Sequence, residues 1–91
     1  MSATFTKDPA AELDYSVDWT AWLEEDEEIT DVDWTVPSGI TGEVRVENTE
    51  PLQTIWLSGG SPGRGYRITN HIRTNMNRVD ERTLMIRVRE R

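Results

Sequence analysis

Hydrophobic and polar residues alternate along much of the chain, which is the pattern of a β-strand with one buried face. Segments of this kind lie at residues 13–21, 31–36, 42–47, 66–74 and 82–90. A shorter segment, residues 54–57, is apolar on both faces and predicts a strand at the centre of a sheet. The alternation predicts that the core is built from Leu13, Tyr15, Val17, Trp19, Ala21, Val32, Trp34, Val36, Val44, Val46, Tyr66, Ile68, Ile72, Leu84, Ile86 and Val88.

Residues that favour turns separate these segments, at 37–39, 48–51 and 75–77. The turn at 75–77 joins two alternating segments and predicts one long antiparallel hairpin. The connection at residues 58–65 holds four glycines and one proline, so it predicts an irregular loop, either flexible or binding. It lacks the Lys-Ser/Thr pair of a phosphate-binding loop, and no helical pattern follows it.

Six clear strands, with room for a seventh, and turns at intervals of about 8–12 residues favour an all-β fold. We expect an immunoglobulin-like antiparallel β-sandwich with an extended N-terminal arm. The 91 residues fit a single domain, so residues 1–12 are assigned to the arm and residues 13–91 to the sandwich. The arm carries Phe5 and Lys7, and two alternatives stay open for it: disorder or packing on its own domain, and docking on a neighbouring protein.

Charge is distributed unevenly along the chain, whose net charge is −7. Residues 1–36 hold eleven acids against one lysine, and residues 37–91 hold nine arginines against six acids. One interpretation is an acidic protein with internal ion pairs. The other is a molecule whose basic end meets the acidic end of a neighbour. Because an acidic domain repels phosphate, we expect no nucleic-acid partner.

No group of residues predicts catalysis. His71 is the only histidine and lies on the polar face of a strand, so it is interpreted as a surface side chain. With one histidine and no cysteine, we expect no zinc site and no cofactor. The five consecutive acids at 24–28 predict a solvated loop, with an incidental calcium site or a patch for a basic partner as the alternatives. No run of apolar residues is long enough to span a membrane, and no signal peptide is expected.

Four tryptophans are present, and three of them, Trp19, Trp34 and Trp56, lie in strand segments that predict core positions. Trp22 lies outside the alternation and is interpreted either as core or as an interface aromatic. The candidate partner-binding residues are Phe5, Lys7, Trp22, Glu24, Glu25, Asp26, Arg64, Arg73 and Met76.

Several short motifs occur in an order that resembles a family of small tailed-phage virion proteins, often labelled fiber–tail adaptor proteins. The motifs are Lys7-Asp8-Pro9, Asp14-Tyr15, Asp18-Trp19, Trp22-Leu23, Trp34 to Gly39, Trp56 to Gly60 and Asp80 to Val88. The chain departs from the family pattern in its acidic run at 24–28 and in the segment Asn70 to Arg73.

The resemblance implies an immunoglobulin-like fold, no enzymatic activity and a place in the virion after assembly in the host cytoplasm. The leading hypothesis is an adaptor that links the tail or neck to fibers, present in several copies in a ring or another symmetric assembly. The first alternative is a capsid cement protein bound to the major capsid protein. The second is an enzyme or carbohydrate-binding module in which Trp22 stacks on a sugar.

Overall fold

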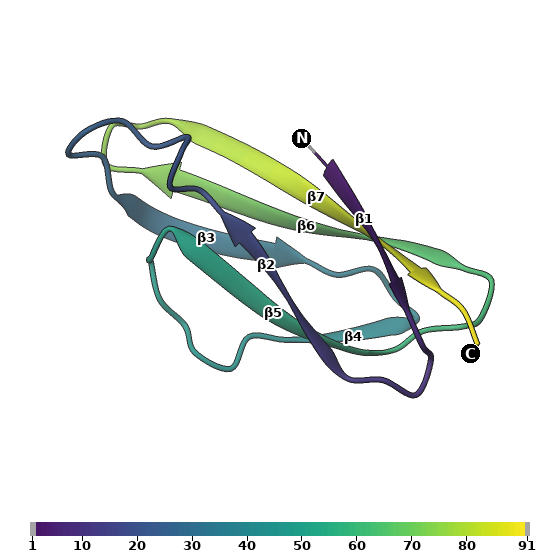
Figure 1. Ribbon diagram of the computed structural model, residues 1–91. Coiled ribbons are helices and arrows are strands. Elements are labelled where there is room, and N and C mark those ends of the chain that lie inside the picture. Colours follow the sequence, from purple (N-terminus) through teal and green to yellow (C-terminus); the bar gives the residue numbers. More distant parts are fainter. Residues whose placement is uncertain (1, 91) are drawn as a thin grey trace.

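The computed structural model describes residues 2–90, which form seven strands and no helix. The strands are β1 (Ser2–Lys7), β2 (Leu13–Asp18), β3 (Ile29–Thr35), β4 (Ile40–Glu43), β5 (Leu52–Gly59), β6 (Gly65–Thr74) and β7 (Val79–Val88). They build one sheet in the order β1-β7-β6-β3 and a second in the order β2-β5-β4 (Figure 1). The expected all-β class is confirmed.

The core lies between the two sheets and follows the predicted alternation. Its buried hydrophobic residues are Tyr15, Val17, Trp19, Ile29, Ile40, Ile55, Leu57, Tyr66, Ile68, Ile72, Leu84, Ile86 and Val88. Three predicted core residues are exposed instead: Leu13, Ala21 and Val46. Val46 follows the end of β4, so it lies in a connection and not on a sheet face.

The predicted hairpin is confirmed, since β6 and β7 pair antiparallel from Gly65↔Arg87 to Arg73↔Val79. Asn77 at its tip has φ of 57°, a conformation that asparagine tolerates better than most residues. β7 begins three residues earlier than residue 82, the start predicted from the alternation.

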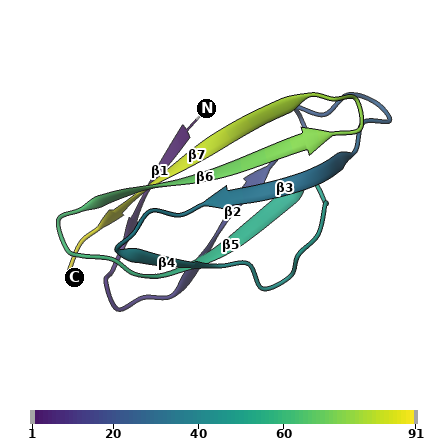
Figure 2. The ribbon, with the colours of Figure 1, turned by 180° about the vertical axis from the view of Figure 1, so that it is seen from behind.

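The extended N-terminal arm is not observed. Residues 2–7 form β1, which pairs parallel with β7 from Ser2↔Thr83 to Lys7↔Val88 (Figures 1 and 2). Phe5 packs on Tyr15 of β2, with ring centroids 5.2 Å apart. Six residues with a single aromatic give little alternation, and a parallel pairing with the far end of the chain has no local sequence signal.

Two tryptophans differ from the predicted core positions. Trp56 lies on the outer face of the β2-β5-β4 sheet, because its neighbours Ile55 and Leu57 point inward. The Arg45 guanidinium stacks on its ring, with Cζ 3.9 Å from the ring centroid. Trp34 is only partly buried and lies at the edge of the core.

The molecule is elongated, with extents of 44 × 23 × 19 Å. The β2–β3 connection and the tip of the β6–β7 hairpin lie at one end, on the left in Figure 1. The β3–β4 and β5–β6 connections lie at the opposite end. The acidic run 24–28 and the glycine-rich loop are therefore separated by the length of the sandwich.

Candidate interaction surfaces

The acidic end of the molecule comprises the loop 19–28 and the hairpin tip 75–78. Four acids of the run are exposed, namely Glu24, Glu25, Asp26 and Glu28, but Glu27 is buried. The expectation of a fully solvated acidic loop is therefore wrong for Glu27. The alternation gives no sign of this burial, since Glu27 has the same kind of neighbours as the other acids.

Glu27 is held by donors from two elements. Arg78 Nε donates to Glu27 Oε2 at 2.8 Å, Thr74 Oγ1 donates to the same oxygen at 2.6 Å, and the Glu24 amide donates to Oε1 at 2.9 Å. Arg78 Nη2 also donates to Oε1. These hydrogen bonds, the Arg78 bonds first, lower the pKa of Glu27 from 4.5 to about 2, against the opposing effect of burial.

Backbone contacts also join the loop to the hairpin tip. The Asn75 amide donates to the Glu28 carbonyl at 2.9 Å, and the Glu28 amide donates to Asn75 Oδ1 at 2.9 Å. Beside them the Met76 side chain is 47% exposed. The predicted candidates Glu24, Glu25 and Asp26 thus share one end of the molecule with Met76, on a loop tied to the hairpin.

Trp22 belongs partly to the core and partly to this end. It is partly buried, and its ring meets Trp19 edge-on with centroids 5.3 Å apart. Arg78 Cζ lies 4.0 Å from its ring centroid. Because the guanidinium stacks on the indole, Trp22 presents one side at most to a partner.

An arginine face lies on the outer side of the β6–β7 hairpin, toward the opposite end. Arg64, Arg67 and Arg87 line an open cavity of about 590 Å³ together with Pro37, Ser38, Gly63, Gly65, Tyr66 and Met85. None of the three arginines forms an ion pair with another residue in the part of the chain that the structure describes. This face therefore carries uncompensated positive charge.

The predicted residues Arg64 and Arg73 are not brought together. Arg73 lies near the other end of β6, about 20 Å beyond Arg67 at the usual strand rise. It pairs in register with Asp31 of β3. The sequence analysis missed Arg67 and Arg87, which lie on the same outer sheet face as Arg73 but at the opposite end of it.

Lys7 is not a surface residue. Its side chain is buried, and Nζ donates to the carbonyls of Gly59 at 2.8 Å and Asp8 at 2.9 Å. Burial lowers the pKa of Lys7, while the Asp8 carboxylate acts in the opposite direction. The lysine fastens the β1–β2 connection to the end of β5. Of the two predicted candidates in this segment, Phe5, which is 38% exposed, is the one that a partner can reach.

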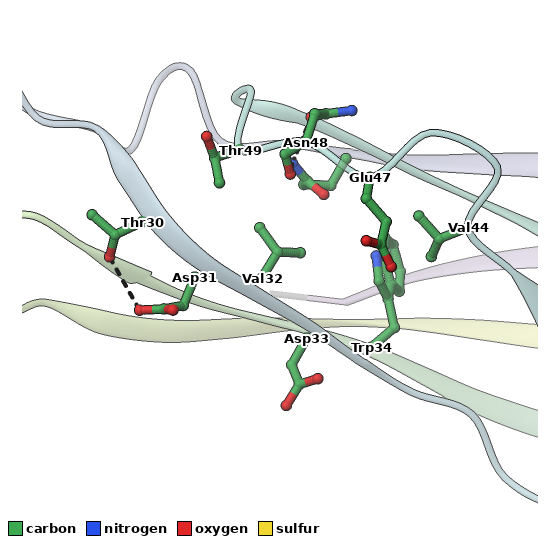
Figure 3. Close-up of a pocket in the computed structure, with 10 residues that line it drawn as sticks. Thr30, Asp31, Val32, Asp33, Trp34, Val44, Glu47, Asn48 and Thr49 are labelled. Carbon is green, nitrogen blue, oxygen red and sulfur yellow. Dashed lines mark hydrogen bonds between the residues drawn. The ribbon is translucent and has the colours of Figure 1, made fainter.

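A groove opens along β3, on the flank where each sheet ends. It has a volume of about 590 Å³ and is lined by Thr30, Asp31, Val32, Asp33, Trp34, Val44, Glu47, Asn48, Thr49 and Gln53 (Figure 3). Trp34 Nε1 is buried there and has no hydrogen-bond partner among residues 2–90. The sequence analysis named none of these residues as a site. The alternation Asp31-Val32-Asp33-Trp34 does indicate a strand with one acidic and one apolar face, which is the pattern that the groove uses.

The described residues include no cluster suited to a metal ion. Across residues 2–90 no group of three or more histidine and carboxylate side chains is placed to hold a metal ion. His71 lies on the outer face between Asp33 and Glu81, its register partners in β3 and β7. Within the same residues no helix is long and apolar enough to cross a membrane.

Comparison with known proteins gives one family match. The family model described as podophage GP4 fiber-tail adaptor protein gp77 matches residues 7–87, nearly the whole chain. No curated protein matches the sequence. The matched range includes all of β2 to β6, all of β7 except its last residue, and only the last residue of β1.

Proposed function

The chain belongs to the podophage GP4 fiber-tail adaptor family, and from this membership we propose that it joins the tail or neck of the particle to the fibers through protein–protein contacts alone. A family of structural adaptors implies a place in the virion and contacts with other tail or fiber proteins.

The main support for the proposal is that negative and positive surface charge lie on different parts of the molecule. An adaptor needs two surfaces that face different neighbours, and this molecule has an acidic end and an arginine face that differ in sign. Opposite surface charges attract different partners and disfavour exchange between them. The ion pair and the Asn75 contacts hold the acidic loop in place, so this end is presented with little ordering cost on binding.

We further propose that several copies form a ring around the tail axis. Contacts between unlike patches on identical subunits close into rings when the rotation allows it. The patches that join the copies would lie on the sides of the sandwich, so the acidic end and the arginine face would remain free for the tail and the fibers.

An immunoglobulin-like arrangement is part of the proposal. The orders β2-β5-β4 and β7-β6-β3 correspond to the two sheets of such a domain, and β1 extends the β7-β6-β3 sheet beside β7. The Tyr66 hydroxyl, at the start of β6, accepts a 2.8 Å hydrogen bond from the Ser61 amide. This contact matches the tyrosine corner of immunoglobulin-like domains.

Charge reversal at each end, in phage assembled with variant protein, tests the adaptor function. One variant carries Arg67→Glu with Arg87→Glu, the second carries Glu24→Lys with Glu25→Lys, and the control carries Asp14→Lys on the outer face of β2. Purified particles are examined by electron cryo-microscopy and by mass spectrometry of their components.

We expect one charge-reversed variant to give tails that keep the adaptor and lack fibers, and the other to give tails that lack both. The control should give normal particles. Copies spread over the capsid shell, in numbers that follow the major capsid protein, would identify a cement protein and overturn the proposal. Full retention of adaptor and fibers in both charge-reversed variants would also contradict it.

A further inference from the structure

The flank formed by β3 and β4 is open. β3 is the last strand of its sheet and β4 the last strand of the other, so both sheets end on this side (Figure 2). The groove between β3 and the connection 44–51 has Val32, Trp34 and Val44 as its apolar part, and all three are partly buried. Apolar surface of this kind is left half covered by the fold.

The groove also leaves hydrogen-bonding groups without partners. Trp34 Nε1 is buried and has no acceptor within residues 2–90, and a buried donor in this condition is rare in folded proteins. Along β3 every second residue directs its backbone N–H and C=O away from β6, because only one side of an edge strand is paired. An added strand would provide acceptors and donors for these groups.

The opposite side of β3 is acidic. Asp31 and Asp33 lie on the outer face and are exposed, and in Figure 3 Asp33 points away from Val32 and the groove. Their register partners in β6 are Arg73 and His71, yet neither acid forms an ion pair within the described chain. The carboxylates are therefore available to cations on a strand that lies next to β3.

We propose that the β3 flank binds an extended segment of a partner protein, added as a strand beside β3, in which apolar and basic residues alternate. Alternate side chains of a strand point to opposite faces. The apolar set would enter the groove over Trp34 and Val44, and the basic set would lie beside Asp31 and Asp33 as cross-strand pairs. That the partner is another virion protein rests on the proposed function.

A second copy of this chain fits the flank poorly. Pairing β3 with β3 of another copy would bring Asp31 and Asp33 beside the same acids of the neighbour, and like charges across strands are destabilising. Charged residues on an edge strand are a common means of preventing such self-association. The same charges favour a basic strand, which is why the occupant is assigned to a different protein.

Two defined peptides test the inference on the isolated chain by NMR. The first peptide alternates lysine and valine, and the control peptide alternates glutamate and valine. We expect the lysine peptide to shift the Trp34 indole N–H resonance and the β3 amides and to slow exchange of the outward-facing amides. The glutamate peptide should bind at least about tenfold more weakly.

Variants then assign the two faces. Asp31→Asn with Asp33→Asn should remove the preference for the lysine peptide, while Asp14→Asn, an exposed acid on β2, should leave it unchanged. Trp34→Phe should weaken both peptides, and its amide spectrum shows whether the fold is kept. The two variants act on different contacts, so misfolding of one leaves the other informative.

Three results would overturn the inference. The lysine peptide could shift no β3 resonance, or it could shift only the acidic end at 19–28. Alternatively, the β3 resonances could move with protein concentration in the absence of peptide, which would assign the flank to a second copy. Failure here, with adaptor still seen on tails in the particle experiment, leaves the proposed function intact. If the adaptor is absent from tails but the lysine peptide binds the β3 flank as expected, the proposed function is contradicted and the peptide-binding inference is kept.

Discussion

The Glu27 carboxylate and the Arg78 guanidinium connect the acidic loop to the β6–β7 hairpin, with Arg78 Nε 2.8 Å from Glu27 Oε2. Arg78 also donates to the Trp22 carbonyl at 3.1 Å and stacks on the Trp22 ring. One arginine thus contacts the acid, backbone and aromatic side chain of the same loop. Buried Glu27 therefore helps to hold the exposed acids of the run in position through its contacts with Arg78.

The first prediction concerns acid stability. The pKa of Glu27 is about 2 in the folded chain and 4.5 ordinarily, so its ionised form is favoured by folding. The stability it contributes is complete above pH 4.5 and is lost as the pH falls from 4.5 toward 2. In urea unfolding at a series of pH values, Glu27→Gln should be less stable than the parent at pH 7. Between pH 4.5 and pH 2 the variant should also lose less stability than the parent.

Glu28→Gln is the matched control for that experiment, since Glu28 is exposed and uses its backbone, not its carboxylate, to contact Asn75. Its pH dependence should follow that of the parent. Identical pH dependence in the parent and in Glu27→Gln would contradict the low pKa.

The second prediction compares two buried tyrosines. The Tyr66 hydroxyl accepts the Ser61 amide at 2.8 Å, whereas the Tyr15 hydroxyl has no partner among the described residues. Tyr66→Phe should lower the free energy of unfolding by about 0.5–1.5 kcal/mol and speed hydrogen exchange at the Ser61 amide. Tyr15→Phe should change it by less than about 0.5 kcal/mol. A larger loss in Tyr15→Phe than in Tyr66→Phe would show that the two hydroxyls have been assigned the wrong roles.

The alternation of polar and apolar residues was sufficient to predict β2, β3 and the β6–β7 hairpin, because one face of each is buried against the other sheet, and the apolar segment 54–57 indicated β5. It failed for β1, whose pairing with β7 joins residues 2–7 to residues 83–88. It also failed for Trp56. A segment that is apolar on both faces predicts burial on both, but this sheet is covered on one face only.

The sequence predicted the charge of the candidate surfaces but not which residues form each of them. The excess of acids in the first part of the chain does correspond to an exposed acidic end, but the arginines of the rest are divided. Arg64, Arg67 and Arg87 lie on the arginine face, whereas Arg78 lies at the acidic end and pairs with Glu27. Which arginines lie close together depends on strand register, so the candidates included Arg64 and the distant Arg73 but not Arg67 and Arg87, which are the neighbours of Arg64. The buried state of Lys7 depends on the Gly59 carbonyl, 52 positions away, which no local pattern reveals.

The third prediction concerns the most buried tryptophan. Trp19 Nε1 donates to Asn70 Oδ1 at 2.8 Å, and both residues have no exposed surface. Trp19→Phe leaves this oxygen without its indole donor and leaves a void, so we expect a loss of about 2–4 kcal/mol in urea unfolding. Trp56→Phe, on the outer face, should cost less than about 1 kcal/mol, the size of its contact with Arg45. Equal losses would show that Trp56 has a covered environment.

The fourth prediction separates backbone strain from close packing in the glycine-rich loop. Gly60 and Gly63 have φ of 95° and 85°, in the left-handed region where an L side chain is strained. A Cβ on Gly63 would meet nothing within 4 Å, whereas a Cβ on Gly60 would lie 2.6 Å from Val88 Cγ2. Gly63→Ala should therefore cost about 1–2 kcal/mol from strain alone. Gly60→Ala should cost about 1–3 kcal/mol more, because Val88 is fully packed in the core.

Urea unfolding of the two alanine variants measures this difference. The contacting methyl group is removed by Val88→Ala, so Gly60→Ala is also measured in the Val88→Ala background. If the extra loss comes from the contact, Gly60→Ala should destabilise the Val88→Ala background by about the same 1–2 kcal/mol as Gly63→Ala destabilises the parent. Equal losses for Gly60→Ala and Gly63→Ala in the parent would mean that the loop moves away from Val88 at little cost. The loop would then be adjustable on the side of the molecule that carries the arginine face.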